Sequence, residues 1–380
     1  MYLVVKRYWR NLIPVVMAGF LVACATSGPT PLPVPPVSHP DKLSIIWSDS
    51  DLAKSPAYQF VPVVDDNAIF TADAKGNIFK IDRTDGTIIS HFKLKRDLSS
   101  GTAVSSDSIF VTGKAANLYS INKVTGKINW RAKLPTISVE APQISGHIIL
   151  VKTNDANLLA YDTDSGSLLW VYQKPIPTLT LRTNNSFAIV DKEVAAIGEP
   201  SGRLVLINIT NGNPIWENYI AVSEGATDLD KLTDVAVRPV LYEKTICVGT
   251  FNGKLACLDA ISSNIIWSKK FSTAYGVLID AQNVYAINVE GVLYAFDKAT
   301  GASIWTNDVL RYRSVSPPVF LENNILVVDN DGYINLFNRN GGQLVARVAS
   351  NLKGGVSYPI SDNKRVIAQS ASGDIAEITQ

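Results

Sequence analysis

The fold can be read from the stretch Asn117-Leu118-Tyr119-Ser120-Ile121-Asn122, which is followed by Thr125-Gly126 and then by Trp130. The alternation of apolar and polar residues indicates a β-strand, and the turn after it indicates an antiparallel partner strand that carries the indole. The chain repeats this pattern in both directions. Copies that keep the tryptophan end at Trp130, Trp170, Trp216, Trp267 and Trp305. Two weaker copies have Ser90 and Ala346 at that position.

The spacing between copies averages a little over forty residues, a length that suits the four strands of one propeller blade. Seven copies are complete. An eighth is divided between the chain ends: residues 364–379 supply its first strands, and Ile45-Ile46-Trp47 supplies the missing tryptophan strand. Joining the two ends in one blade removes free sheet edges. The sequence therefore predicts an all-β, eight-bladed β-propeller of four-stranded antiparallel blades over residues 43–380, closed by its N- and C-terminal strands.

The repeated tryptophans have a structural explanation. An indole at a fixed place in each blade can bury roughly 150–250 Å² against the next blade, whereas a residue that binds a ligand is rarely needed six times. We therefore expect a packing role, and no role in binding, for the six blade tryptophans: Trp47, Trp130, Trp170, Trp216, Trp267 and Trp305.

The N-terminus reads as an export signal. Lys6, Arg7 and Arg10 precede a twelve-residue apolar stretch that ends in small residues, as in a secretory signal peptide and shorter than the roughly 20 residues of a membrane span. Leu21-Val22-Ala23-Cys24 resembles the lipobox of bacterial lipoproteins, which implies removal of residues 1–23 and lipidation of Cys24. An ordinary signal peptide with a chance cysteine is the alternative.

The residue after the cysteine and the segment beyond it set the expected location. In the lipoprotein sorting pattern of Gram-negative bacteria, Ala25 in place of aspartate implies the outer membrane, with the protein lipid-anchored and facing the periplasm. Six prolines between Pro29 and Pro40 then favour an extended tether over residues 24–42, with roughly 50 Å of reach.

Composition argues against nucleic acid and against catalysis. Without Lys6, Arg7 and Arg10 the chain has 32 basic and 34 acidic residues, so it lacks the basic excess of a nucleic-acid-binding protein. Its only histidines are His39, in the tether, His91 and His147. No metal-binding spacing, phosphate loop or nucleophile elbow is present. We expect no catalytic residues, no metal and no cofactor; an unrecognised hydrolase site on the ring axis is the alternative.

Two cysteines leave a question open. Cys247 and Cys257 lie on opposite arms of the hairpin around Phe251-Asn252-Gly253, and an oxidising periplasm would permit a disulfide. Disulfide geometry is specific, and a register difference of one residue decides whether the sulfurs face each other. Two buried thiols are favoured over a bridge.

Function should lie where the repeat is broken. The steps from Trp170 to Trp216 and from Trp216 to Trp267 are longer than their neighbours, because residues 175–186 and 222–239 are insertions. Leu179 and Leu181 point the same way on an extended segment. Arg182 offers a planar fork of donors, which is frequent in interface hot spots. A purely structural alternative has both leucines in the core and Arg182 paired with Asp234.

Both insertions, the lipobox and the blade count together resemble the family of BamB, the propeller lipoprotein of the outer-membrane β-barrel assembly machinery. In that family the corresponding loops contact the periplasmic POTRA domains of BamA. The resemblance implies that Leu179, Leu181 and Arg182 form the first contact motif and that Asp234 is the first acid of the second motif. The family has a further acid where this chain has Ala236, so the second contact is expected to be either weaker or rebuilt with Asp228 or Asp230.

The expected function is a non-catalytic scaffold that binds BamA and assists the folding and insertion of outer-membrane proteins, with the unfolded proteins as further partners. The repeat also resembles the blades of pyrroloquinoline quinone dehydrogenases, but their vicinal cysteine pair and calcium ligands cannot be matched here. A quinone-dependent or other periplasmic propeller enzyme, or a module that binds envelope polysaccharide, are the alternatives.

Overall fold

The computed structural model describes residues 29–37, 40–55, 60–181, 186–222, 227 and 232–380. The predicted roles of Cys24, Arg182, Asp228 and Asp230 fall outside these residues.

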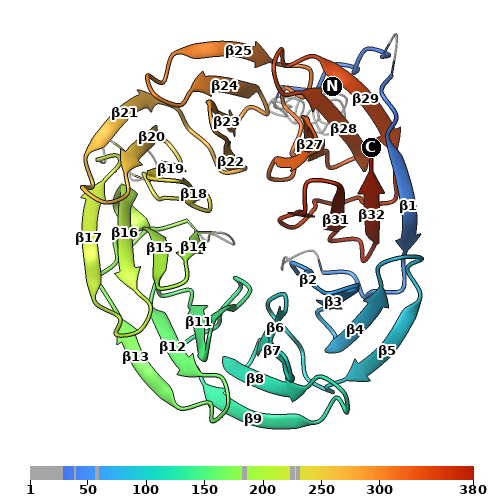
Figure 1. Cartoon of the computed structure of the whole chain (residues 1–380), viewed down its shortest axis with the longest axis vertical. Coiled ribbons are helices and arrows are strands. Elements are labelled where there is room, and N and C mark those ends of the chain that lie inside the picture. The colour runs from blue at the N-terminus through green and yellow to red at the C-terminus, as the bar shows by residue number, and fades with distance from the viewer. Residues whose placement is uncertain (1–28, 38–39, 56–59, 182–185, 223–226, 228–231) are drawn as a thin grey trace, which may run out of the picture.

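Eight four-stranded antiparallel sheets stand around a ring, which confirms the predicted propeller (Figure 1). The strands of blades 1 to 4 are β2 (Val63–Asp65), β3 (Ala68–Ala72), β4 (Asn77–Asp82), β5 (Ile88–Lys93), β6 (Ala103–Val104), β7 (Ser108–Gly113), β8 (Asn117–Asn122), β9 (Ile128–Lys133), β10 (Gln143–Ser145), β11 (Ile148–Lys152), β12 (Leu158–Asp162), β13 (Leu168–Tyr172), β14 (Phe187–Asp191), β15 (Val194–Glu199), β16 (Arg203–Asn208) and β17 (Pro214–Tyr219). A short 3-10 helix, η1 (Pro200–Gly202), lies between β15 and β16.

Blades 5 to 8 complete the ring. Their strands are β18 (Val240–Tyr242), β19 (Thr245–Gly249), β20 (Lys254–Asp259), β21 (Ile265–Lys270), β22 (Gly276–Ile279), β23 (Asn283–Ile287), β24 (Leu293–Asp297), β25 (Ser303–Asn307), β26 (Val319–Leu321), β27 (Asn324–Val328), β28 (Tyr333–Asn338), β29 (Leu344–Ala349), β30 (Ile360–Ser361), β31 (Arg365–Gln369), β32 (Ile375–Thr379) and β1 (Ser44–Asp49). In blade 8 the N-terminal β1 pairs with the C-terminal β32, as predicted.

Position in the blade explains the strand sequences. The second strand of a blade is covered on both faces by neighbouring blades, so β3 is buried along its whole length and reads as an apolar run. The fourth strand lies at the rim, where the residues of β5 alternate between exposed and half-buried. The period-two pattern that reveals a strand is therefore clearest at the outside of the ring.

Each blade tryptophan ties its blade to the next one. Its indole Nε1 donates to a main-chain carbonyl in the turn that joins the third and fourth strands of the following blade. The pairs are Trp47 with Arg83, Trp130 with Thr163, Trp170 with Ile209, Trp216 with Ala260, Trp267 with Lys298 and Trp305 with Arg339, at 2.8–3.2 Å. Except at Trp216, whose turn has Ser263 instead, the indole also covers a glycine of that turn: a Cβ at Gly301 would lie 2.6 Å from Cδ2 of Trp267.

Blades 1 and 7 lack the tryptophan for different reasons. In blade 1, Ser90 takes the tryptophan position, and Phe92, two residues further along β5, covers the turn glycine Gly126 instead. In blade 7, Ala346 faces blade 8, whose third and fourth strands are the two chain ends and have no hairpin turn between them. An indole there has no turn carbonyl to reach.

The structure decides between a disulfide and two free thiols for the cysteine pair. Cys247 of β19 lies directly opposite Cys257 of β20, with Cα atoms 4.1 Å apart, and a disulfide joins them. The preference for two thiols was wrong because the hairpin places the two residues in direct register, which sequence alone did not fix. Both residues are fully buried. Closing a loop of this length stabilises the fold by roughly 3 kcal/mol in the chain-entropy view.

The described part of the proline-rich segment lies against the ring. Val34 packs on the core shared by blades 6 and 7. Further along, the amide of Asp41 donates to the carbonyl of Val345 in β29 at 2.7 Å. At the other end the guanidinium of Arg313 donates to the carbonyl of Leu32 at 3.0 Å and pairs with Asp331 at 2.7 Å. The described part of this segment is thus a strap fixed to the rim.

Candidate partner-binding face

Both insertions lie on one face of the ring. In each blade the turn from second to third strand and the connection to the next blade emerge on the same side, because the strands alternate in direction. Residues 173–186 connect β13 to β14, and residues 220–239 connect β17 to β18. We call the side that carries these connections the loop face; the turns between third and fourth strands mark the opposite face.

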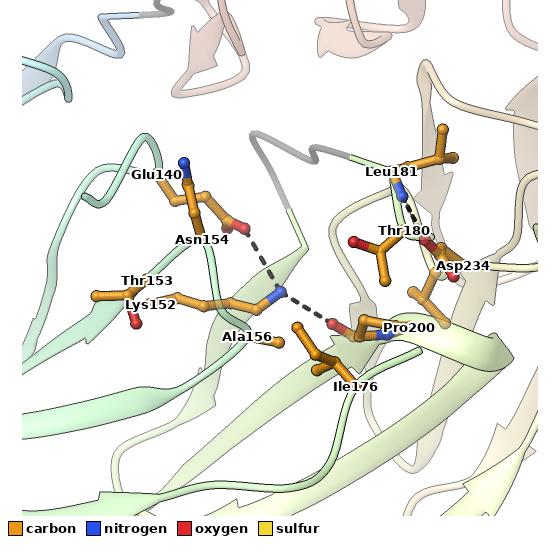
Figure 2. A pocket seen from close by; sticks show the side chains of 12 residues that line it. Glu140, Lys152, Thr153, Asn154, Ala156, Ile176, Thr180, Leu181, Pro200 and Asp234 are labelled. Atoms are coloured by element: carbon orange, nitrogen blue, oxygen red, sulfur yellow. Dashed lines mark hydrogen bonds and ion pairs between the residues drawn. The ribbon is translucent and has the colours of Figure 1, made fainter. Parts of the chain in front are cut away.

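Asp234 organises the loop face from below. Its side chain is 3% exposed. One carboxylate oxygen accepts from the amide of Leu181 at 2.6 Å (Figure 2). The other accepts from the amide of Ser201 at 2.9 Å. Hydrogen bonds to an ionised acceptor are about twice as strong as neutral ones. A single carboxylate therefore ties both insertions to the β15–β16 turn, and both of its oxygens are used within the chain.

The two leucines of the first motif face outward to different degrees. Leu179 is 47% exposed and Leu181 is half-buried. In Figure 2 the side chain of Leu181 points away from Asp234, whose carboxylate holds its main chain. The alternative that both leucines belong to the core does not hold for Leu179. The surface that these two residues share with the loop main chain is called the leucine patch below.

A buried polar cluster supports the first insertion, and sequence reasoning missed it. The ammonium of Lys152 lies 3.6 Å from a Glu140 carboxylate oxygen and donates to the carbonyl of Gly198 at 3.0 Å (Figure 2). Glu140 also accepts from the amide and hydroxyl of Ser186, at 2.9 and 2.5 Å. These residues come from three separate chain segments, so no local sequence motif predicts the cluster.

Glu140 and Lys152 of this cluster line a cavity of about 260 Å³ under the leucine patch, which Leu181 and Asp234 also line. All three polar side chains of the cluster are buried and paired with one another. Ser186 is fully enclosed, so its hydroxyl is not placed to attack a substrate. The cluster fixes where β14 begins and hence where the first insertion ends.

A second buried pair stands beside it at the end of β15. Glu199 is buried, and Nε of Arg203 donates to its carboxylate at 2.5 Å. Burial raises the pKa of Glu199, and the charge of Arg203 opposes that rise without cancelling it. The pair braces η1, whose Ser201 amide reaches Asp234.

Chemistry-bearing groups are sparse in the described part of the chain. No group of three or more histidine, cysteine, aspartate or glutamate side chains there could hold a metal ion. His91 stacks on Phe79, with ring centroids 4.6 Å apart. Within the same residues no helix has the length and apolar character needed to cross a membrane.

The chain matches known proteins over most of its length. Residues 47–307 match the family model described as outer membrane protein assembly factor BamB. The BamB of Taylorella asinigenitalis is 38% identical over 336 residues, which cover 88% of this chain and 87% of that one. The BamB of Pseudomonas aeruginosa is 39% identical over 344 residues, which cover 89% and 90%.

Solved structures agree with the fold. The structure of BamB from Moraxella catarrhalis has a TM-score of 0.80 at 23% identity and covers 89% of this chain and all of that one. A quinohemoprotein alcohol dehydrogenase from Comamonas testosteroni has a TM-score of 0.71 at 13% identity, covering 89% and 76%, a likeness of fold alone. On the family model and the two relatives, the chain belongs to the BamB family of outer membrane protein assembly factors.

Proposed function

We propose that this protein is a non-catalytic scaffold of the outer-membrane β-barrel assembly complex, and that its loop face binds the periplasmic POTRA domains of BamA. The observation that supports this most is the exposure of Leu179 beside a Leu181 whose main chain is held in place by a buried carboxylate. The relatives are named as assembly factors, which favours a scaffold over an enzyme.

The geometry suits a binding site in physical terms. A few residues near the centre of a patch supply most of the energy of an interface, and the contacts around them exclude water. Ordering a loop on binding costs free energy, so loops that are already fixed bind more tightly. Asp234 and the Lys152 cluster fix both insertions from inside the ring.

Unfolded outer-membrane proteins are the further partners that we propose. Rim strands of several blades expose aliphatic side chains at their starts, among them Ile89, Leu168 and Ile215. Such side chains offer apolar contacts to an extended chain without belonging to the leucine patch.

The strap supports a specific orientation toward the membrane. We propose that Cys24 carries the lipid that anchors the protein to the outer membrane, facing the periplasm. Arg313 holds Leu32 at the loop face, since it lies in the β25–β26 connection and pairs with Asp331 in the β27–β28 turn. Cys24 precedes Leu32 by eight residues, which span at most about 29 Å. The chain that leads to Cys24 therefore departs from the face that carries the leucine patch.

Co-purification from native membranes tests the binding face. We expect the lipidated Leu181→Glu variant to recover roughly a tenth or less of the BamA that the wild type recovers, because a charged side chain would replace the apolar one in the leucine patch. The matched control is Val124→Glu, since Val124 is 84% exposed on the opposite face. Equal BamA recovery by wild type and a folded Leu181→Glu variant would show that the leucine patch is not the contact.

A further inference from the structure

Arg238 is a charged residue with no ionic partner among the residues that the structure describes. It is the last residue but one of the second insertion, two residues before β18 begins. Its guanidinium makes no hydrogen bond or ion pair with any residue that the structure describes, and its Nε is buried without a partner. A buried donor that is left unsatisfied costs free energy, so a site of this kind gains when an acceptor arrives.

The guanidinium is nevertheless held in a fixed place. Its Cζ lies 4.8 Å from the ring centroid of Tyr358, which belongs to the segment leading into blade 8, whereas Arg238 leads into blade 5. A cation over an aromatic face is attracted to the ring, more strongly when water is excluded. The contact joins the segments that lead into blades 5 and 8, and it positions the guanidinium at the mouth of a cavity that both residues line.

A cavity of about 380 Å³ opens beside Arg238 at this mouth. Aromatic and aliphatic side chains line it, including Phe251, Tyr275 and Val315. Leu181 lines it as well, so the cavity is continuous with the leucine patch. Among the described residues that line the cavity, Arg238 is the only one with a charged side chain.

The charge of this site is opposite to the charge that the family resemblance implies. Both carboxylate oxygens of Asp234 accept hydrogen bonds from main-chain amides inside the ring. The position of the second acid is Ala236, which is half-buried and also lines the cavity. Among the described residues of this stretch, the charge available to a partner is therefore the cation of Arg238.

We propose that the cavity beside Arg238 binds a carboxylate carried by an apolar, acidic segment of the partner, with its apolar side chain against Phe251 and Tyr275. Arginine suits this role because its planar fork can bind a carboxylate with two parallel hydrogen bonds. The inference rests on the proposed function and deepens it, because it names the chemistry that the partner brings to this face.

Affinity measurements on the full-length mature protein in detergent test the proposal, with the periplasmic region of the same organism's BamA as the probe. Truncating one partner of a desolvated charge pair weakens binding by roughly 30-fold or more, so Arg238→Gln should show this loss. It should also lose part of the salt dependence of the wild-type dissociation constant. Arg311→Gln is the matched control, since Arg311 is an exposed arginine already paired with Glu290 on the loop face; it should change affinity by less than about 3-fold.

Ala236→Asp provides a second variant that leaves Arg238 and Tyr358 intact. An acid at this half-buried position would compete for the guanidinium within the chain, so the affinity for the probe should fall at least about 5-fold. Tighter binding by Ala236→Asp, or a folded Arg238→Gln variant with wild-type affinity and salt dependence, overturns the carboxylate site. Failure of the wild type itself to bind the probe overturns the proposed function and this inference with it.

Discussion

Replacing Trp267 by alanine should lower the free energy of unfolding by about 3–5 kcal/mol. The side chain is 7% exposed and packs beside Phe296, with ring centroids 6.1 Å apart. Its Nε1 donates to the carbonyl of Lys298 in blade 6 at 2.8 Å. Alanine would remove the link between blades 5 and 6 and leave a cavity over Gly301. Denaturant unfolding followed by circular dichroism measures the loss.

Ser90→Ala is the matched control, because Ser90 occupies the same blade position without an indole. Its hydroxyl is buried with no hydrogen-bond partner in the described structure, so removing it should change the free energy of unfolding by less than about 1 kcal/mol. An unfolding midpoint for Trp267→Ala equal to that of the wild type would contradict a packing role for the blade tryptophans.

Asp234→Ala should release both insertions and weaken partner binding together. The amides of Leu181 and Ser201 would lose their acceptor; two hydrogen bonds to a charged group contribute about 3 kcal/mol or more. We expect hydrogen exchange at these two amides to accelerate, and the affinity for the periplasmic region of BamA to fall at least about 10-fold as the leucine patch loses its fixed geometry.

Asp234→Asn tests whether Asp234 acts through position, since asparagine keeps one acceptor oxygen and should show intermediate exchange and affinity. A loss of affinity in Asp234→Ala without faster exchange at Leu181 and Ser201 would mean that the carboxylate contacts the partner itself. That outcome would contradict the buried role that the structure gives it.

The fold could be predicted because the sequence pattern of one propeller blade recurs several times along the chain. Rim strands face solvent on one side and a neighbouring blade on the other, so their period-two pattern and the Trp130-type tryptophans stand out in every copy. The sequence pattern did not predict that Phe92 replaces the tryptophan of blade 1, because the aromatic residue lies two positions further along the strand. The pairing of Cys247 with Cys257 depended on hairpin register, which composition does not determine.

The candidate site could be located but not explained from sequence. The insertions were recognisable because they lengthen the spacing between repeats, and Leu179 and Asp234 lie in them. The burial of Asp234 depends on amides 53 and 33 residues earlier in the chain, and only the folded ring brings them together. The docking of the strap on Arg313 depends in the same way on contacts 281 residues apart.

Site-specific photo-cross-linking in native membranes tests whether the loop face binds BamA. A photoreactive residue at Leu179 should cross-link to BamA, whereas the same residue at Val124, on the opposite face, should not. Cross-linking from Val124 together with none from Leu179 would contradict the assignment of the face.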